Sequence, residues 1–183
     1  MKIIAFGASS SAKSINKQLA TYAANLAAQA SESITIEILD LNDFELPLFS
    51  QDKEVELGHP EAAKAFYNKL GASDAIIISY AEHNGSYTAA YKNLFDWTSR
   101  IAQKVFQNKP MLLLATSPGP GGASSVLATA TDSAFYFAGE VIASLSVPSF
   151  FDNFDVGSTQ LQNDELQQKL LAAVNDLLSS LAS

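Results

Sequence analysis

Short apolar runs alternate along this chain with segments in which apolar residues recur every three or four positions. The runs lie at residues 2–6, 34–39, 75–79, 111–115 and 141–147. Residues 34–39 alternate apolar with polar side chains, as in a half-buried strand, whereas residues 75–79 and 111–115 are almost continuously apolar, as in a strand covered on both faces. The runs therefore predict five β-strands.

The segments between and after these runs carry helical periodicity. The apolar stripes are Ile15, Leu19, Tyr22, Leu26 and Ala30; Ala62, Ala63, Phe66 and Leu70; Ala90, Leu94, Trp97 and Ile101; and Leu161, Leu166, Leu170, Val174, Leu177 and Leu181. Residues 125–138 are also compatible with a helix, and Pro60 and Gly71 suit the start and the end of the second stripe. Strands that alternate with helices predict a doubly wound α/β fold with a parallel sheet.

Residues 46–60 show neither period. A connection of this length in a compact domain is often functional or part of an interface. We see no internal repeat and no convincing linker, so we expect residues 1–183 to form a single domain.

Composition and charge exclude several classes of function. The chain has no cysteine, which rules out disulfides, thiolate metal sites and a cysteine nucleophile. With only two distant histidines, His59 and His83, we expect no metal site. A net charge of −8 disfavours a broad nucleic-acid footprint. Because Met1 runs directly into a strand pattern with no long apolar segment, we expect a cytoplasmic protein without a membrane anchor.

The first strand leads into a serine-rich turn before the first helical stripe. Ser9, Ser10, Ser11, Ser14 and Asn16 supply hydrogen-bond donors there. Successive backbone N–H groups and the positive end of the following helix favour an anion, so this turn predicts a phosphate site. A helix N-cap with no ligand is the alternative.

Two further loops follow the third and fourth strands. The former is rich in polar groups around Asn84 and Gly85, and the latter, residues 116–122, contains three glycines that let the backbone approach a flat ligand. If the strands lie in the order 2-1-3-4-5, these loops and the serine-rich turn share the edge where ligands bind in such sheets. A phosphorylated planar cofactor such as FMN fits this outline.

Four ordered segments resemble those of the NAD(P)H-dependent FMN reductases, a flavodoxin-like family that includes quinone, chromate and azo-dye reductases. The segments are Gly7 through Asn16, residues 46–52, residues 82–86 with 92–97, and residues 117–122. Each segment alone is weak evidence, but their order and spacing are fairly specific. The resemblance covers nearly the whole chain and implies a flavodoxin-like three-layer sandwich with a five-stranded parallel sheet.

The resemblance also implies a set of FMN-binding positions. Ser14 and Asn16, with one or more of Ser9 to Ser11, would bind the phosphate, and residues 82–85 would line the ribityl chain and ring edge. The residues of the last loop would pass along the pyrimidine side of the ring. The full set is Ser9, Ser10, Ser11, Ser14, Ile15, Asn16, Glu82, His83, Asn84, Gly85, Ser117, Pro118, Gly119, Gly121 and Gly122.

The chain departs from the family pattern in two places. The arginine of the first loop is absent and that loop is one residue longer, so Lys13 would replace part of the lost charge. The family's P-E-Y-N sequence reads Ala81-Glu82-His83-Asn84, which removes a tyrosine ring beside the flavin.

The implied activity is hydride transfer from NADPH or NADH, through bound FMN, to a quinone or similar small acceptor, with no catalytic acid or base required. The resemblance further implies a homodimer or homotetramer. Two other functions share the fold: a flavodoxin-type electron carrier and a non-enzymatic ligand sensor.

Several side chains carry competing interpretations. We expect Glu82 to be an exposed loop carboxylate rather than a general base, and Trp97 with Asp96 to form mostly core and helix face. The aromatic groups 135–137 and 150–154 are typical of a core, although exposed phenylalanines there would indicate a dimer face or a wall of the substrate pocket.

Overall fold

The computed structural model describes residues 1–182 and contains one central parallel sheet. Its strands are β1 (Lys2–Ala8), β2 (Thr35–Leu39), β3 (Ala75–Tyr80), β6 (Lys109–Thr116) and β7 (Gly139–Val147). They pair in the order β2-β1-β3-β6-β7, all parallel. The predicted strands and the order 2-1-3-4-5 are therefore confirmed, with each strand longer or shorter than its apolar run by a few residues.

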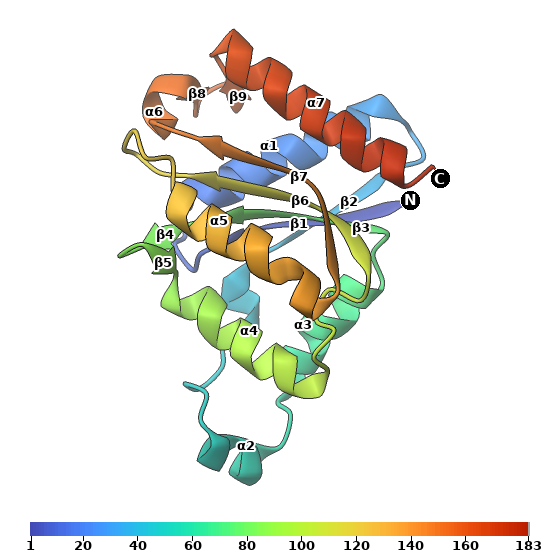
Figure 1. Cartoon of the computed structure of the whole chain (residues 1–183), viewed down its shortest axis with the longest axis vertical. Helices are drawn as coiled ribbons and strands as arrows, with labels where there is room; N and C mark the ends of the chain where they lie inside the picture. Colours follow the sequence, from blue (N-terminus) through green and yellow to red (C-terminus); the bar gives the residue numbers. More distant parts are fainter. Residues whose placement is uncertain (183) are drawn as a thin grey trace.

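Helices cover both faces of the sheet and give three layers (Figure 1). On one face lie α1 (Ile15–Ala30) and α7 (Asp164–Ser180), which pack on Ile3, Ile77 and Leu112. On the other lie α3 (Glu61–Gly71), α4 (Ala89–Ile101) and α5 (Ser124–Ser133), which pack on the alternate strand residues, including Ile4 and Ile76. The flavodoxin-like three-layer sandwich is confirmed.

Short elements occupy the connections. They are the 3₁₀ helices η1 (Leu41–Phe44) and η2 (Ala134–Phe137), the helices α2 (Gln51–Leu57) and α6 (Phe150–Asn153), and the two-residue strands β4 (Glu82–His83), β5 (Ser86–Tyr87), β8 (Phe154–Asp155) and β9 (Gln160–Leu161). Leu161, which we placed in the stripe of the closing helix, belongs to β9 instead. Within residues 1–182, no helix combines the length and the apolar character needed to cross a membrane.

The buried face of α1 differs from the predicted stripe. Apart from Asn16 and Leu19, it is made of alanines at positions 20, 23, 24 and 27, whereas Ala30 is exposed and Tyr22 and Leu26 are half-buried. Small side chains let the helix lie close to the sheet. At Gly7 the approach is so close that a Cβ atom would stand 2.4 Å from the backbone nitrogen of Lys17.

Residues 46–60 form an arm that projects from the body of the molecule and carries α2 at its tip (Figure 1). None of the residues of α2 is buried. The base of the arm is fixed to α4, because the Asn93 amide donates to the carbonyls of Leu46 and Pro47 and the indole of Trp97 donates to Pro47 at 2.7 Å. Trp97 is fully buried, as expected.

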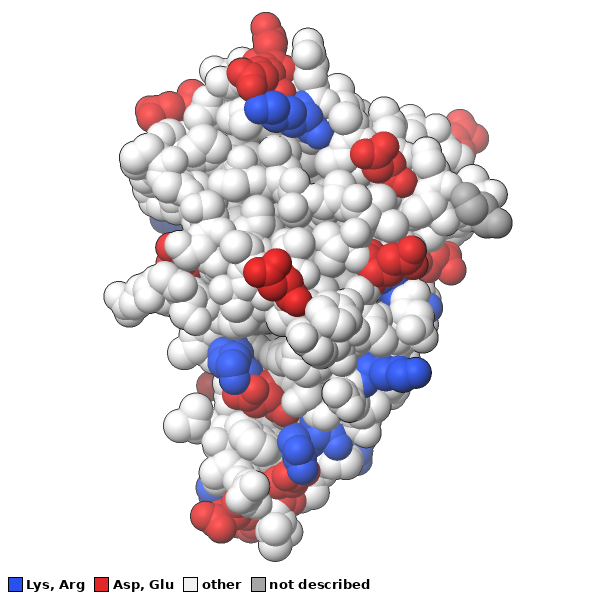
Figure 2. Space-filling model, in the orientation of Figure 1, with Lys and Arg blue, Asp and Glu red and all other residues white. Residues whose placement is uncertain are grey.

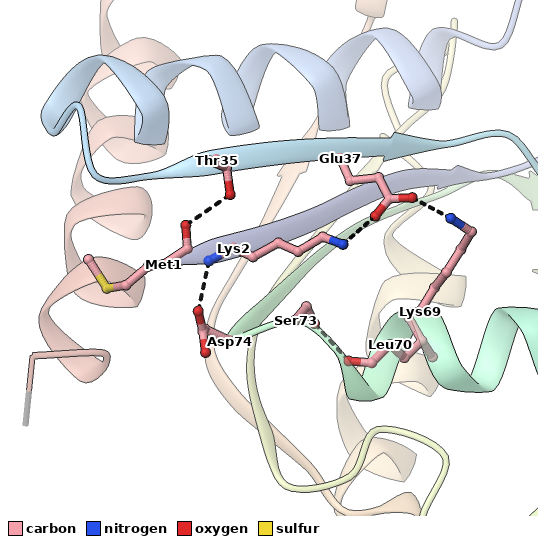
Figure 3. A network of polar contacts seen from close by, with 8 residues as sticks. All are labelled: Met1, Lys2, Thr35, Glu37, Lys69, Leu70, Ser73 and Asp74. Atoms are coloured by element: carbon pink, nitrogen blue, oxygen red, sulfur yellow. Dashed lines mark hydrogen bonds and ion pairs between the residues drawn. The ribbon is translucent and has the colours of Figure 1, made fainter.

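Polar contacts join the amino-terminal ends of the sheet strands to α3 (Figure 3). The Glu37 carboxylate on β2 accepts from Lys2 on β1 at 2.7 Å and from Lys69 on α3. Asp74 accepts from the backbone N–H of Lys2 at 2.7 Å. Hydrogen bonding to Lys2, followed by that to Lys69, lowers the pKa of Glu37 from its ordinary value of 4.5.

We expect Glu37→Gln to lower the free energy of unfolding at neutral pH by about 1 kcal/mol, since it removes two ion pairs. A carboxylate whose pKa is lowered by folding stabilises the fold above its unfolded pKa, and this contribution is lost as the pH falls through the folded value. The difference between variant and wild type in urea unfolding should therefore shrink below pH 4.5. Glu61→Gln is the control, since its pair with Lys64 is exposed; equal effects of both variants would contradict this assignment.

Candidate functional site

The loops that follow β1, β3 and β6 meet at the carboxyl edge of the sheet, around a hollow of about 280 Å³. Its lining residues are Ser9, Ser11, Lys13, Ser14, Ile15, Asn16, Ala81, Glu82, His83, Thr116, Ser117, Pro118 and Phe151. Nine of the residues predicted to bind the cofactor are therefore brought together in one place.

The start of α1 offers hydrogen-bond donors to this hollow. Ser14 is the N-cap, and its hydroxyl oxygen accepts from the backbone N–H of Lys17 at 3.1 Å. The backbone N–H groups of Ile15 and Asn16 have no hydrogen-bond acceptor among residues 1–182. Free N–H groups at the positive end of a sixteen-residue helix favour an anion.

The side chain of Asn16 also has a structural role inside the protein. It is 2% exposed, and its amide nitrogen donates to the Thr116 carbonyl at 3.0 Å. Its oxygen accepts from the Ser79 hydroxyl at 2.7 Å and from the Thr116 backbone N–H at 3.0 Å. One hydrogen of this amide nitrogen has no acceptor among residues 1–182, so that hydrogen and the backbone N–H of Asn16 remain available to an anion.

Glu82 is held by a helix rather than left free in solvent. Its carboxylate accepts from the backbone N–H of Val126 in the first turn of α5 at 2.9 Å. A carboxylate at a helix N-terminus is electrostatically favourable. The expectation of a merely exposed loop carboxylate is wrong, and Glu82 instead connects the loop after β3 to the helix after β6.

The segment between Tyr80 and Tyr87, expected as a polar loop, contains the hairpin β4-β5. Asn84 and Gly85 form its turn with φ angles of 53° and 77°, as in a type I′ turn, for which Asn-Gly is the commonest sequence. Both residues are exposed at the tip and do not line the hollow. His83 does line it, and with Ser10 it also lines an adjoining depression beside Thr88.

The glycines of the loop after β6 divide into two kinds. Gly122 has a φ of 58°, and a Cβ atom there would meet the Ser146 hydroxyl at 2.3 Å and the Cα of Pro148 at 3.1 Å. Its lack of a side chain thus allows close packing against Ser146 and Pro148 at the end of β7. Gly119 and Gly121 face open space, although neither lines the hollow itself.

Lys13 is the one lysine or arginine that lines the hollow in the described part of the chain, and it makes no ion pair there. The neighbouring Lys17 is bound to Asp40, and that hydrogen bond, with a second from the Asn42 backbone, lowers the pKa of Asp40. Positive charge for a phosphate therefore rests on Lys13 and on the start of α1.

Four lining residues were not among the predicted binding positions: Lys13, Ala81, Thr116 and Phe151. Phe151 is 63% exposed beside the fully buried Phe150. Its exposure agrees with a wall of the site, which was one of the interpretations left open from the sequence. Because Phe150 and Phe151 are adjacent and identical, the sequence alone did not predict which of the two rings is exposed.

Comparison with known proteins identifies a family. The family model for NADPH-dependent FMN reductase matches residues 1–152. An NADPH:quinone oxidoreductase of Arabidopsis thaliana is 31% identical over 125 residues, 68% of this chain and 62% of that protein. A 2-hydroxy-1,4-benzoquinone reductase of Burkholderia sp is 36% identical over 110 residues, 60% of this chain and 56% of that protein. The match thus spans less than two thirds of the length of either relative.

Solved structures share the fold. The flavoenzyme NAD(P)H:(acceptor) oxidoreductase FerB from Paracoccus denitrificans superposes with a TM-score of 0.77 at 20% identity, covering 99% of this chain and 97% of that one. The apo form of an NADH:FMN oxidoreductase superposes with a TM-score of 0.73 at 20% identity, and the match covers 97% of this chain and 89% of that one. At this identity the likeness shows the architecture alone.

We expect Asn16→Ala to lower the free energy of unfolding by about 3 kcal/mol, because it leaves the Ser79 hydroxyl and the backbone of Thr116 without partners in a buried place. Asn25→Ala, an exposed position on the same helix, should change it by less than about 0.5 kcal/mol. Urea unfolding of both variants measures the difference. Similar losses of unfolding free energy for Asn16→Ala and Asn25→Ala would show that the Asn16 amide does not hold the loops together.

Proposed function

Because the chain belongs to the NADPH-dependent FMN reductase family, we propose that it binds FMN in the hollow at the carboxyl edge of the sheet. With NADPH or NADH as the reductant, it then reduces a quinone or a similar small acceptor. The observation that carries this proposal is that Ile15 and Asn16, at the start of α1, line the hollow and that their backbone N–H groups have no acceptor among residues 1–182.

The residues present fit a phosphorylated flavin. The N–H groups at the start of α1, the hydroxyl of Ser14 and the ammonium group of Lys13 would hold the phosphate. Ser117 and Pro118 would lie along the ring, with open space beside Gly119 and Gly121. Bound FMN supplies the hydride chemistry, as it accepts two electrons from a nicotinamide and gives them to the acceptor.

The chain's own contribution is binding, orientation and exclusion of water. Glu82 holds the β4-β5 hairpin against α5, and Thr88 holds the start of α4 to the carbonyl of Ala8 at 2.9 Å. These contacts fix the walls of the hollow. Phe151 supplies an apolar wall that would shield a reacting ring from solvent. No side chain is needed as a catalytic acid or base in this account.

The direct test combines a spectrum with an assay. After incubation with FMN and desalting, the protein should retain flavin absorbance and should oxidise NADPH or NADH with menadione as acceptor. Protein that retains no flavin and oxidises neither nicotinamide, even with added FMN, would overturn the proposal. Flavin retained without nicotinamide oxidation would contradict the enzymatic half and favour an electron carrier.

We expect phosphate binding by Lys13 to make FMN affinity depend on salt. Lys13→Gln should raise the FMN dissociation constant about threefold at low ionic strength, and less at about 1 M salt, where screening removes the charge term. Lys53→Gln on the distant α2 is the matched control and should leave the constant unchanged. Measured by flavin fluorescence, affinity that is independent of salt in wild type would refute this account of the phosphate site.

We also propose that the chain forms one cytoplasmic domain and associates as a homodimer or homotetramer. The projecting arm supports association, because Leu48 and Val55 on it are 80% and 88% exposed.

A further inference from the structure

A second hollow, of about 250 Å³, lies between α4, α5 and the β4-β5 hairpin and shares no lining residue with the candidate FMN site. We propose that it is a binding site for a neutral, planar aromatic carbonyl compound of one or two rings. Binding there requires neither FMN nor a nicotinamide, so this inference is independent of the proposed function.

The shape of the ligand follows from the lining. Six aromatic rings line the hollow: Tyr80, Tyr87, Tyr91, Phe95, Phe106 and Phe137. Each contacts at least one other ring of the set, with centroids 4.7 to 5.8 Å apart. Such a lining favours another flat ring in stacked or edge contact. The volume is below that of sites for drug-sized ligands, which limits the occupant to a small molecule.

The carbonyl follows from a spare hydrogen-bond donor. The hydroxyls of Tyr80 and Tyr91 lie 3.5 Å apart and form one shared hydrogen bond, although each carries a hydrogen. Since only one of them donates to the other, one O–H has no acceptor among residues 1–182. Tyr80 is 1% exposed and Tyr91 3%, so the cost of leaving this donor unpaired is substantial. A carbonyl oxygen in the hollow would accept it.

Both phenols remain donors at neutral pH. Burial raises the pKa of Tyr80 and that of Tyr91 well above the ordinary value of 10. The hollow therefore favours a ligand with a hydrogen-bond acceptor over a ligand that has only hydrogen-bond donors.

The charge at the mouth of the hollow argues for a neutral ligand. Lys92 and Asp96 both line it, and they form an ion pair with the ammonium nitrogen 2.7 Å from one carboxylate oxygen and 2.8 Å from the other. Their charges cancel locally, and basic and acidic side chains adjoin over α4 in Figure 2. Neither an anion nor a cation would gain from entering.

The first test uses 1,4-naphthoquinone and naphthalene, which share a ring system but differ in the two carbonyl groups. Calorimetric titration of FMN-loaded protein without nicotinamide should show naphthoquinone binding in the hollow about fivefold more tightly than naphthalene. Because the chain contains no cysteine, the quinone cannot add to a thiol. Ser133→Leu should fill the hollow and remove this binding event, while Ala128→Leu, outside the lining on the same helix, should preserve it.

The second test removes the donors. Tyr91→Phe alone should retain the preference for the quinone, because it frees the hydroxyl of Tyr80 to donate. Tyr80→Phe with Tyr91→Phe should lose the preference and bind both probes equally, in a fold kept by the isosteric replacement.

Each of three titration results would overturn the proposal: equal binding of the two probes to wild type, undiminished binding to Ser133→Leu, or an unchanged preference in the double variant. Sedimentation of Ser133→Leu and Ala128→Leu completes the test. If Ser133→Leu alone dissociates an oligomer and wild type binds no probe, a second copy of the chain covers the hollow, and the proposal is wrong.

Discussion

The side-chain amide of Asn16 is the interaction on which the arrangement of the site depends. It is buried at the start of α1 and bonds to the Ser79 hydroxyl on β3 and to both backbone groups of Thr116 at the end of β6. One side chain thereby joins the start of α1, which follows β1, to the ends of the two neighbouring strands β3 and β6. Because a buried amide with an unmet bond is costly, the three loops are fixed in relation to one another.

This constraint explains how a site can form with little side-chain charge. With α1 held so close to β1 that only glycine fits at position 7, the first residues of α1 line the hollow. Glu82 then fixes the hairpin to α5, so two helix starts and one hairpin form a rigid frame. The frame offers N–H groups, hydroxyls and Lys13 where many anion sites offer arginine. The binding of FMN would thus rest mainly on preorganised backbone.

The sequence was sufficient for the architecture because the apolar runs and the alternation of strands with helices are local signals. It was less informative wherever a partner lies far along the chain. Asn16 and Thr116 are a hundred positions apart, so the role of Asn16 inside the protein could not be read from its motif. The hydrogen bond from the Val126 N–H to Glu82 was missed because these residues are also far apart in the sequence. The buried alanine face of α1 was missed because packing against the sheet, rather than apolar periodicity, determines which face of the helix is buried. The Asn-Gly turn of the hairpin, by contrast, carried a local signal that could have been used.

The central claim is that the N–H groups of Ile15 and Asn16, fixed in place by the Asn16 side chain, bind the phosphate of FMN. Amide hydrogen exchange, followed residue by residue with and without FMN, tests it most directly. The account predicts that exchange at these two amides slows markedly on addition of FMN, whereas amides in the exposed arm are unaffected. Exchange at Ile15 and Asn16 that stays unchanged while FMN is bound would contradict the account.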